Sequence, residues 1–555
     1  MPVPALRLRD VNGAPVRPGG DHVLYWMTAA RRASHSFALD RAAERCRELG
    51  RPLLVLEALR AGHPHASDRL HAFVLQGMAG NAAAFARAGV TYLPYVEPRP
   101  GAGRGLLQAL AARACCVVTD DSPASFLPRM VAAAGHRLPV RLEAVDGAGL
   151  LPLRAAPRAF LTAHAFRRFL QRELPRHLRE APSPRPPSRL GLPAAVLPRP
   201  VAARWPRAGG ELLRAEPAAL ARLEIDHGVA PAADRGGTAA ARAALAAFLP
   251  RLARYAEDRD HPDRAGGSGL SPWLHFGHLS PHEVLGAVAA AEGWSDTRLG
   301  ERADGKRSGW WGMSPGAEAF LDQLVTWREL AQGYLAHRPD AAGYDTLPPW
   351  ALATLERHAR DPRPWRADPE SLEAARTPDA LWNAAQRELR ATGRMHGYLR
   401  MLWGKKILEW SATPRDALAE MIRLNDRYAL DGRDPNSVAG ITWCLGRFDR
   451  PWGPERPVLG TVRYMTSGST ARKLRLREWL RRWSEGEPAP VTRGSAASAP
   501  SGGGPARSAR PGSPPRAAAR GGAPASPGRR AAGARAGSRR SGRAAPRGRR
   551  PAGRA

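Results

Sequence analysis

The chain has 555 residues, and its 84 basic residues outnumber 51 acidic ones to give a formal charge of +33. Fifteen arginines and no acidic residue lie from Arg493 onward, so the part before them still carries +18. This excess predicts a polyanionic partner, most simply nucleic acid, and the length allows two or three domains with a substantial core.

The sequence argues against metal sites and disulfides. Its cysteines are Cys46, Cys115, Cys116 and Cys444; they form no CxxC pair, and no His/Cys cluster has metal-ligand spacing. A reducing cytoplasm fits this usage best. No apolar run approaches the roughly 18 residues of a membrane span, and the first residues do not resemble a secretory leader. We therefore expect a cytoplasmic protein with no membrane partner.

Strand and helix patterns alternate over residues 21–151. Strands are expected at 22–27, 52–59, 90–97, 115–121 and 139–145, and helices at 36–50, 68–89, 105–114 and 126–135. This alternation predicts an α/β domain with a doubly wound parallel sheet. The sequence GAGRG at 101–105 is a weak match to a dinucleotide-binding loop, and the neighbouring prolines favour a turn there.

The rest of the chain divides by composition. Residues 152–234 are rich in Pro, Arg and Ala and predict an interdomain linker across the surface, with a basic helix at 164–178. Helical patterns dominate residues 235–486, which predict a second, all-α domain. Residues 487–555 lack apolar periodicity and are predicted to be disordered. This tail is either a solvated extension or a salt-sensitive tether for polyanions.

Two stretches of the helical domain have unusual composition. Gly267, Ser268 and Gly269 precede a helix start, where N–H groups and hydroxyls can cradle a phosphate, although an ordinary capped helix explains the same residues. Farther on, three tryptophans stand among Arg, Lys, His and Asn at positions 382, 403 and 410. Core packing is the alternative interpretation of these indoles, but their polar surroundings are atypical of a core.

Four motifs carry a resemblance to a known family. They are LSPWLHFGHLSP at 270–281, WNAAQRELRATGRMHGYLRMLWGKKILEW at 382–410, LNDRYALDGRDPN at 424–436 and GPERPVLGTVRYM at 453–465. The first resembles the flavin-phosphate segment of the DNA photolyase and cryptochrome family. The others resemble class II cyclobutane pyrimidine dimer photolyases, and the resemblance extends from about residue 21 to 483.

The resemblance implies a fold, an activity and cofactors. It implies that the helical domain binds FAD and that the α/β domain has room for an antenna chromophore, a deazaflavin or a folate. The substrate would be UV-damaged DNA, whose pyrimidine dimer is flipped into a pocket and split by a light-driven electron from reduced FAD. A monomer that associates with the nucleoid through DNA is also implied.

The resemblance further implies roles for individual residues. The positions that match adenine and phosphate contacts are Tyr255, Ser268, Leu270 and Ser271. Arg400 and Asp431 match a flavin-side salt bridge, and Asn425 matches the amide that faces the reactive flavin nitrogen. Three tryptophans match an electron-transfer relay. It would run from Trp403 beside the flavin through Trp382 to Trp410 at the surface.

The implied dimer pocket contains one departure from the family. Trp327 and Trp443 match its aromatic wall, with Met401 against it. Where the family carries a glutamate that bonds the pyrimidine carbonyl, this chain has Gln323, which can donate a hydrogen bond but cannot act as an acid. Its neighbour Asp322 should point elsewhere, one residue round the helix.

Other readings stay open. A cryptochrome-like photoreceptor of the same fold would signal without repairing, and Gln323 and the tail favour it slightly. A flavin-free basic nucleic-acid-binding protein would explain the charge but not the tryptophans. Basic residues that are candidates for a DNA-facing patch are Arg394, Lys405, Lys406, Arg447, Arg450 and Arg456. We do not expect catalysis by His275 or His278, which have no evident nucleophile partner.

Overall fold

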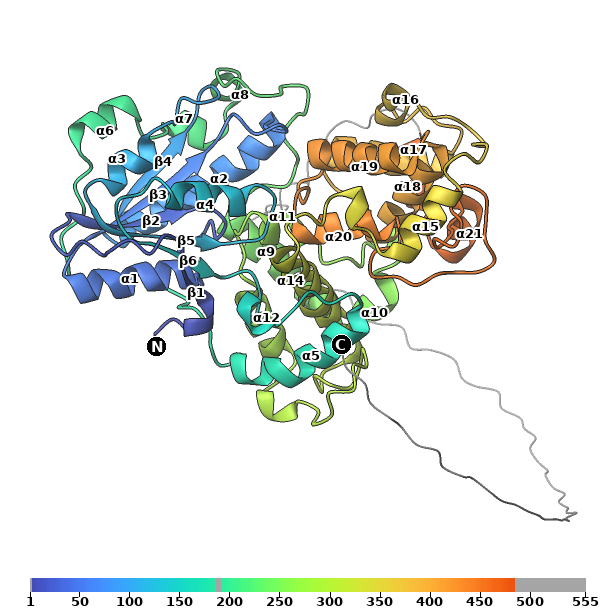
Figure 1. The fold of residues 1–555 in the computed structure, drawn as a ribbon, viewed down its shortest axis with the longest axis horizontal. Coiled ribbons are helices and arrows are strands. Elements are labelled where there is room, and N and C mark those ends of the chain that lie inside the picture. The colour runs from blue at the N-terminus through green and yellow to red at the C-terminus, as the bar shows by residue number, and fades with distance from the viewer. Residues whose placement is uncertain (1, 186–190, 485–555) are drawn as a thin grey trace, which may run out of the picture. The chain divides into compact units, whose positions relative to one another are not determined.

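The structure is a computed structural model that describes residues 2–185 and 191–484. The predicted disordered tail, 487–555, lies outside the described residues. Figure 1 shows strands near the N-terminal end of the chain and helices in most of the remainder. No helix in the described ranges is long and apolar enough to cross a bilayer.

A six-stranded sheet forms the first part of the chain. Its strands are β1 (Leu8–Asp10), β2 (His22–Met27), β3 (Leu53–Leu59), β4 (Thr91–Val96), β5 (Ala114–Asp121) and β6 (Leu142–Asp146), in the spatial order β1-β6-β5-β2-β3-β4. Strands β2 to β6 pair in parallel, which confirms the predicted doubly wound sheet. The three-residue strand β1, which was not predicted, pairs antiparallel with β6 at the edge.

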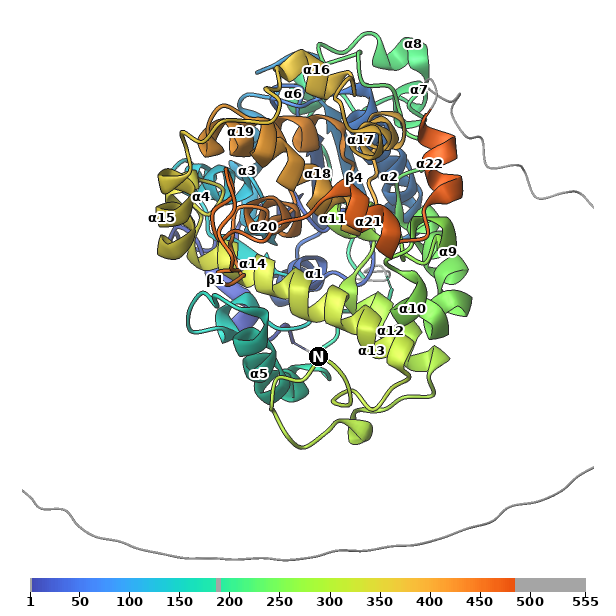
Figure 2. The same ribbon diagram turned by 90° about the vertical axis from the view of Figure 1, so that its right-hand side faces the viewer.

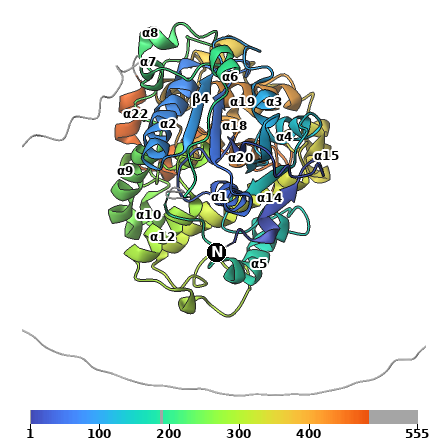
Figure 3. The ribbon, with the colours of Figure 1, turned by 90° about the vertical axis from the view of Figure 1, so that its left-hand side faces the viewer.

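Both faces of the sheet are covered by helices, as the strand sequences require. Val23, Tyr25 and Met27 of β2 are buried in one cluster with residues of α1 (Phe37–Leu49) and α2 (Asp68–Arg87). Leu24 and Trp26 point to the opposite face, toward α3 (Leu106–Ala111) and α4 (Leu127–Gly135). A strand buried on both faces has a continuous apolar run, and β2 has one at residues 23–27, after His22. Figure 3 views these strands with their helices.

The connection between sheet and helices is more structured than predicted. It contains α5 (Ala163–Glu173), the 3₁₀ turn η3 (Leu174–His177), α6 (Arg199–Arg204), α7 (Gly210–Leu213) and α8 (Pro217–Leu220). Phe166 and Phe169 of α5 are buried in the core of the helical part, and Trp205 is buried against the sheet. The segment therefore contributes to both cores instead of only crossing the surface.

Helices make up the part of the chain after residue 237, apart from 3₁₀ turns and a π-helical turn. They are α9 (Thr238–Phe248), α10 (Tyr255–Asp258), α11 (Ser271–His275), α12 (Pro281–Ala291), α13 (Pro315–Leu321), α14 (Arg328–His337), α15 (Pro349–Arg357), α16 (Pro369–Glu373), α17 (Ala380–Thr392), α18 (Gly397–Trp410), α19 (Pro414–Tyr428), α20 (Pro435–Trp443), α21 (Ser467–Lys473) and α22 (Arg477–Ser484). Figure 2 looks onto this part, with α14, α18 and α20 near its centre.

Two buried ionic side chains join the sheet part to the helical part. The guanidinium of Arg69, on α2, donates to backbone carbonyls at the ends of α17 and α19, those of Leu389, Arg390 and Tyr428, at 3.3, 2.7 and 2.9 Å. Glu329 of α14 accepts the backbone N–H groups of Leu150 and Leu151 at 2.7 and 3.0 Å. Arg69 thereby satisfies carbonyls that a helix leaves unpaired at its C-terminus.

Candidate functional site

The three tryptophans singled out in the sequence form a continuous chain of ring contacts. Trp382 of α17 stacks on Trp403 of α18 with ring centroids 6.4 Å apart and planes 4° apart. Trp382 also meets Trp410 edge-on at 5.6 Å. The order Trp403–Trp382–Trp410 is therefore a path of adjacent indoles, although two of them lie on one helix and the middle one lies on its neighbour.

The outer end of this chain is not where it was expected. Trp410 is only 4% exposed, so the expectation that it lies at the surface is wrong. Its ring packs edge-on against Trp365, whose centroid is 5.3 Å away and whose side chain is partly exposed. The sequence analysis missed Trp365 because it lies 45 residues before Trp410 in an irregular segment rich in Pro and Arg.

Hydrogen bonds fix the two inner indoles. Trp382 Nε1 donates to the backbone carbonyl of Trp403 at 3.0 Å, and Trp403 Nε1 donates to Gln386 Oε1 at 2.9 Å. Asp379 caps α17 by accepting from the Trp382 backbone N–H at 3.0 Å, which sets the first turn of that helix. Gln386 follows Trp382 by one helical turn, and this spacing is the signal that could have identified it.

Residues matched to the flavin converge near the start of α18. Arg400 Nη2 lies 3.0 Å from Asp431 Oδ1. Burial opposes the charge of Asp431, but Arg400 and the Ser271 hydroxyl outweigh it and hold the pKa of this carboxyl below its ordinary value. The structure therefore brings Ser271, Arg400 and Asp431 together with Asp431 ionised.

Asn425 has a fixed amide orientation. Its Nδ2 donates to Ser437 Oγ at 2.8 Å and to Asp426 Oδ1 at 2.9 Å, and the residue is 2% exposed. Since a carboxylate only accepts, Asp426 forces the NH₂ group toward itself. The carbonyl oxygen of Asn425 is then the end of the amide that can serve a ligand.

The predicted phosphate loop lies ahead of α11. Ser268 Oγ accepts from the Leu270 backbone N–H at 3.4 Å, and Gly269 has φ +67°, which a residue with a side chain rarely adopts. The carbonyl of Gly269 accepts from Arg394 at 2.8 Å, and Arg394 also pairs with Asp234. Tyr255, the first residue of α10, is buried and meets Phe248 and Phe320 edge-on.

A π-helical turn, η7 (Asp322–Trp327), interrupts the helical run between α13 and α14. Insertions of this kind are frequent at functional sites, and periodicity in the sequence does not reveal them. Asp322 bonds Arg167 at 2.9 and 2.8 Å, so it points away as expected. Gln323 and Trp327, on the same turn, are partly exposed.

The two tryptophans of the predicted dimer wall stack on each other. Ring centroids of Trp327 and Trp443 are 5.1 Å apart, with planes 19° apart. Met401 of α18 lies beside the end of α20, where its carbonyl accepts from the Cys444 thiol at 3.8 Å. The pair therefore forms one aromatic block, with Met401 on the adjoining helix.

Two basic residues proposed for a DNA-facing patch are buried instead. Lys405 Nζ donates to the carbonyl of Cys444 at 2.6 Å, and burial lowers its pKa to about 8. Arg447, 2% exposed, bonds the Tyr334 hydroxyl at 2.6 Å and the Ala341 carbonyl at 3.0 Å. Both cations hold helices together, because a long side chain near an apolar core bonds carbonyls when no acid is available.

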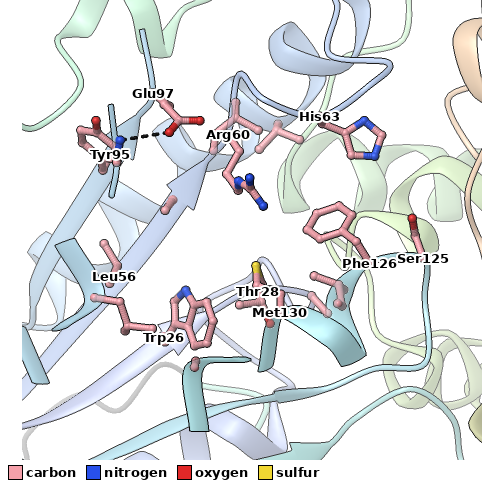
Figure 4. Close-up of a pocket in the computed structure, with 18 of the residues that line it drawn as sticks. Trp26, Thr28, Leu56, Arg60, His63, Tyr95, Glu97, Ser125, Phe126 and Met130 are labelled. Carbon is pink, nitrogen blue, oxygen red and sulfur yellow. Dashed lines mark hydrogen bonds between the residues drawn. The ribbon is translucent and has the colours of Figure 1, made fainter. Parts of the chain in front are cut away.

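A second site is a pocket of about 740 Å³ in the α/β domain, where the resemblance implied room for an antenna chromophore but the sequence identified no lining residues. It opens at the carboxyl ends of β2 to β5, where Trp26 and Thr28 face Phe126 and Met130, as Figure 4 shows. Strand order reverses between β2 and β5, the switch point at which doubly wound sheets bind ligands. Its walls come from several separate segments of the chain. One of them contains Gly101, Gly103 and Gly105 of the GAGRG stretch, which the sequence analysis interpreted as a turn.

Side chains from the helical part close the same pocket. His275, Phe276 and Arg433 line it together with the sheet residues. Glu97, at the end of β4, accepts the backbone N–H groups of Ala61 and Gly103, each at 3.0 Å. The pocket is thus aromatic with a few fixed polar groups, the composition typical of a site for an organic ligand.

Comparisons with known proteins place the chain in a family. No family model matches it. It is 32% identical over 485 residues to a deoxyribodipyrimidine photo-lyase of Methanothermobacter thermautotrophicus, an alignment that covers 86% of this chain and 98% of that protein.

Two solved structures show the same fold. One is a class III photolyase from Agrobacterium tumefaciens, with a TM-score of 0.59 and 19% identity over 84% of this chain and 86% of that one. The other is a Synechocystis cryptochrome, with a TM-score of 0.60 and 16% identity over 83% and 88%. Because the full-length relative is above 30% identity along nearly its whole length, the chain belongs to the deoxyribodipyrimidine photo-lyase family.

Proposed function

We propose that this protein uses light to repair cyclobutane pyrimidine dimers in DNA, with FAD in the helical part as the electron donor. The observation that carries the proposal is the partly exposed stack of Trp327, which ends a π-helical turn, on Trp443, which ends α20. A photoreceptor needs the flavin and the indole chain, whereas a flat aromatic surface in addition to them suits a flipped pyrimidine dimer.

The residues present fit a flavin. The set offers an arginine, an ionised aspartate, an amide carbonyl and hydroxyls, which suit a heterocycle with both donors and acceptors. Gln386 Nε2 and His396 Nδ1 are buried, and neither has a hydrogen-bond partner among the described residues. A bound ligand would supply the missing partners.

FAD, when bound, supplies light-driven one-electron chemistry. Arg400 and Asp431 would hold the flavin side, while Ser268, Leu270, Ser271 and Tyr255 would hold the phosphates and adenine. The carbonyl of Asn425 would accept from a ring N–H, since its NH₂ group is occupied. Trp382 and then Trp410 would replace the electron that Trp403 gives up to the flavin.

The dimer would stack on the outer surface of the tryptophan block, because the two rings already fill the space between them. Met401 would contact it from α18, and the amide of Gln323 would donate to a pyrimidine carbonyl. DNA strands would run over exposed arginines that stack on aromatic rings: Arg450 and Arg463 lie 4.1 and 5.0 Å from Trp452, and Arg456 lies 4.8 Å from Tyr464.

We further propose that the 740 Å³ pocket holds a second, light-harvesting chromophore, a deazaflavin or a folate. Its aromatic lining from Trp26, Tyr95 and Phe126 suits a planar ring, and its position between the sheet and the helical residues 275, 276 and 433 brings that ring close to the flavin region. A cytoplasmic monomer that associates with the nucleoid remains our prediction.

The second candidate is a photoreceptor without repair activity, and Gln323 is the observation that favours it. An amide cannot provide the acidic proton that stabilises a negatively charged dimer. The third candidate, a flavin-free nucleic-acid-binding protein, rests on the charge of +33 alone.

One experiment separates these candidates. The purified protein is examined for visible absorption and then exposed to blue light with a thiol reductant and a dimer-containing oligothymidine, while recovery of the thymine absorption is followed against a dark control. A yellow protein that restores thymine supports repair. A yellow protein that is photoreduced but leaves the dimers intact supports the photoreceptor, and a colourless protein supports the third candidate.

A further inference from the structure

We infer that Trp365 is the outermost member of the indole chain and the residue at which the electron vacancy reaches solvent. The inference rests on the flavin of the proposed function, but it does not depend on DNA repair. It concerns how the protein recharges its cofactor after light absorption.

Contact geometry supports electron transfer between Trp410 and Trp365. Their centroids are 5.3 Å apart with planes at 89°, closer than the 5.6 Å between Trp382 and Trp410. The segment that carries Trp365 is tied to the chain, because the backbone N–H of Ala367 donates to the carbonyl of Trp410 itself at 3.1 Å. Trp365 is therefore held against Trp410 by backbone as well as by ring packing.

The exposed fractions of the four tryptophans indicate the direction in which the positive charge moves. Trp382, Trp403 and Trp410 are 0, 2 and 4% exposed, whereas Trp365 is only partly buried. Trp365 and Trp410 also line a shallow surface pocket with Pro364, Lys406 and Ser467. A positive charge is stabilised where water can reach it, so it moves outward to Trp365.

Hydrogen bonding keeps the inner positions from trapping the charge. The indole N–H groups of Trp403 and Trp382 donate to an amide oxygen and a backbone carbonyl, neither of which is a base at neutral pH. Within residues 2–185 and 191–484 no protein acceptor bonds the indole N–H of Trp410 or Trp365. Proton loss to water is therefore open only at the outer end.

The electron balance is as follows. Trp403 loses one electron to the light-excited, oxidised flavin, and successive single-electron transfers from Trp382, Trp410 and Trp365 refill each vacancy in turn. The Trp365 radical cation then releases its indole proton to water. A dissolved thiolate returns one electron to the neutral Trp365 radical, which takes a proton back, and two oxidised thiols combine to one disulfide.

Transient absorption on the flavin-loaded, full-length protein tests this inference. In wild-type protein we expect a long-lived neutral indole radical after a blue flash. In Trp365→Phe the vacancy stays at buried Trp410, so we expect it to recombine several-fold faster and the yield of thiol-dependent photoreduction to fall. Trp294→Phe is the matched control, because Trp294 is partly exposed and lies 5.9 Å from Trp311 but has no contact with the chain.

Trp365→Tyr provides a spectroscopic signature that loss of packing cannot mimic. If Trp365 is the terminal member, this variant should show a tyrosyl radical by absorption and electron paramagnetic resonance after the flash. Unchanged decay in Trp365→Phe, together with only indole radicals in Trp365→Tyr, would overturn the inference while leaving the proposed function intact. Absence of any indole radical in the flavin-loaded wild-type protein would also overturn the inference, whereas the proposed repair is tested separately with chemically reduced protein.

Discussion

The aromatic block offers the sharpest test of lesion recognition. We predict that Trp327→Ala weakens binding of dimer-containing DNA and leaves binding of undamaged DNA nearly unchanged. Stacking on an aromatic side chain contributes about 1–3 kcal/mol per base. At 1.4 kcal/mol per factor of ten, the dissociation constant for damaged DNA should rise by about 5- to 150-fold.

The same substitution also removes the stacking between Trp327 and Trp443, which is worth about 0.5–1.5 kcal/mol beyond area burial. That loss lowers the melting temperature of the protein but does not change the ratio of its affinities for damaged and undamaged DNA. Fluorescence anisotropy in the dark, with matched damaged and undamaged oligonucleotides, separates the two effects. Trp294→Ala is the control, since it truncates a partly exposed tryptophan of a different cluster.

Two results would refute this reasoning. Equal weakening for damaged and undamaged DNA would mean that Trp327 contacts the duplex and does not support a flipped dimer. Unchanged affinity for both would mean that the lesion, if bound, lies elsewhere.

Three further predictions follow from single side chains. Gln323→Glu should raise the dimer-splitting rate per absorbed photon, measured with fully reduced protein; a lower rate would show that the amide is adapted to this pocket. Gln386→Glu should place a proton acceptor at the indole of Trp403 and lower the yield of photoreduction in flash experiments, and an unchanged yield would contradict the role given to its amide oxygen. His278 is fully buried, accepts from the Gly237 backbone N–H at 2.9 Å, and has its pKa lowered by burial to about 3. Below pH 6.5, the ordinary pKa of histidine, the unfolded chain binds a proton at this residue and the folded chain does not. The free energy of unfolding therefore falls as the pH is lowered. When the pH is lowered from 6.5 to 5, the free energy of unfolding measured with urea should therefore fall by about 2 kcal/mol less in His278→Gln than in wild type. An equal fall in both proteins would contradict a neutral, buried His278.

The sequence predicted the sheet well because each central strand has a local signal. Residues 23–27 are an unbroken apolar run. The helix that follows begins at Ser36, whose side chain accepts from the Leu39 backbone N–H, and ends at Gly50 with φ +62°. The missed strand β1 has only three residues, and its pairing with β6 depends on residues more than 130 positions away. Edge strands of this length carry too little pattern to be predicted.

The site could be predicted only in part, for similar reasons. Spacing and composition pointed to the three tryptophans, but Trp365 joins them through a tertiary contact that no local pattern records. The burial of Lys405 and Arg447 could not be foreseen either, because a basic residue on a helix is far more often solvated. The π-helical turn adds a residue without leaving a trace in the periodicity.

The contacts of Arg69 bear on how this protein can be divided. One guanidinium from the sheet part saturates carbonyls at the ends of both α17 and α19, the helices that carry Trp382 and Asn425. If the helical part were expressed alone, those carbonyls would face water and both helix ends would fray. The ring of Trp382 and the amide of Asn425 would then lose their fixed positions. The N-terminal part therefore stabilises the ends of α17 and α19, and we expect that the helical part cannot be separated from it without loss of this order.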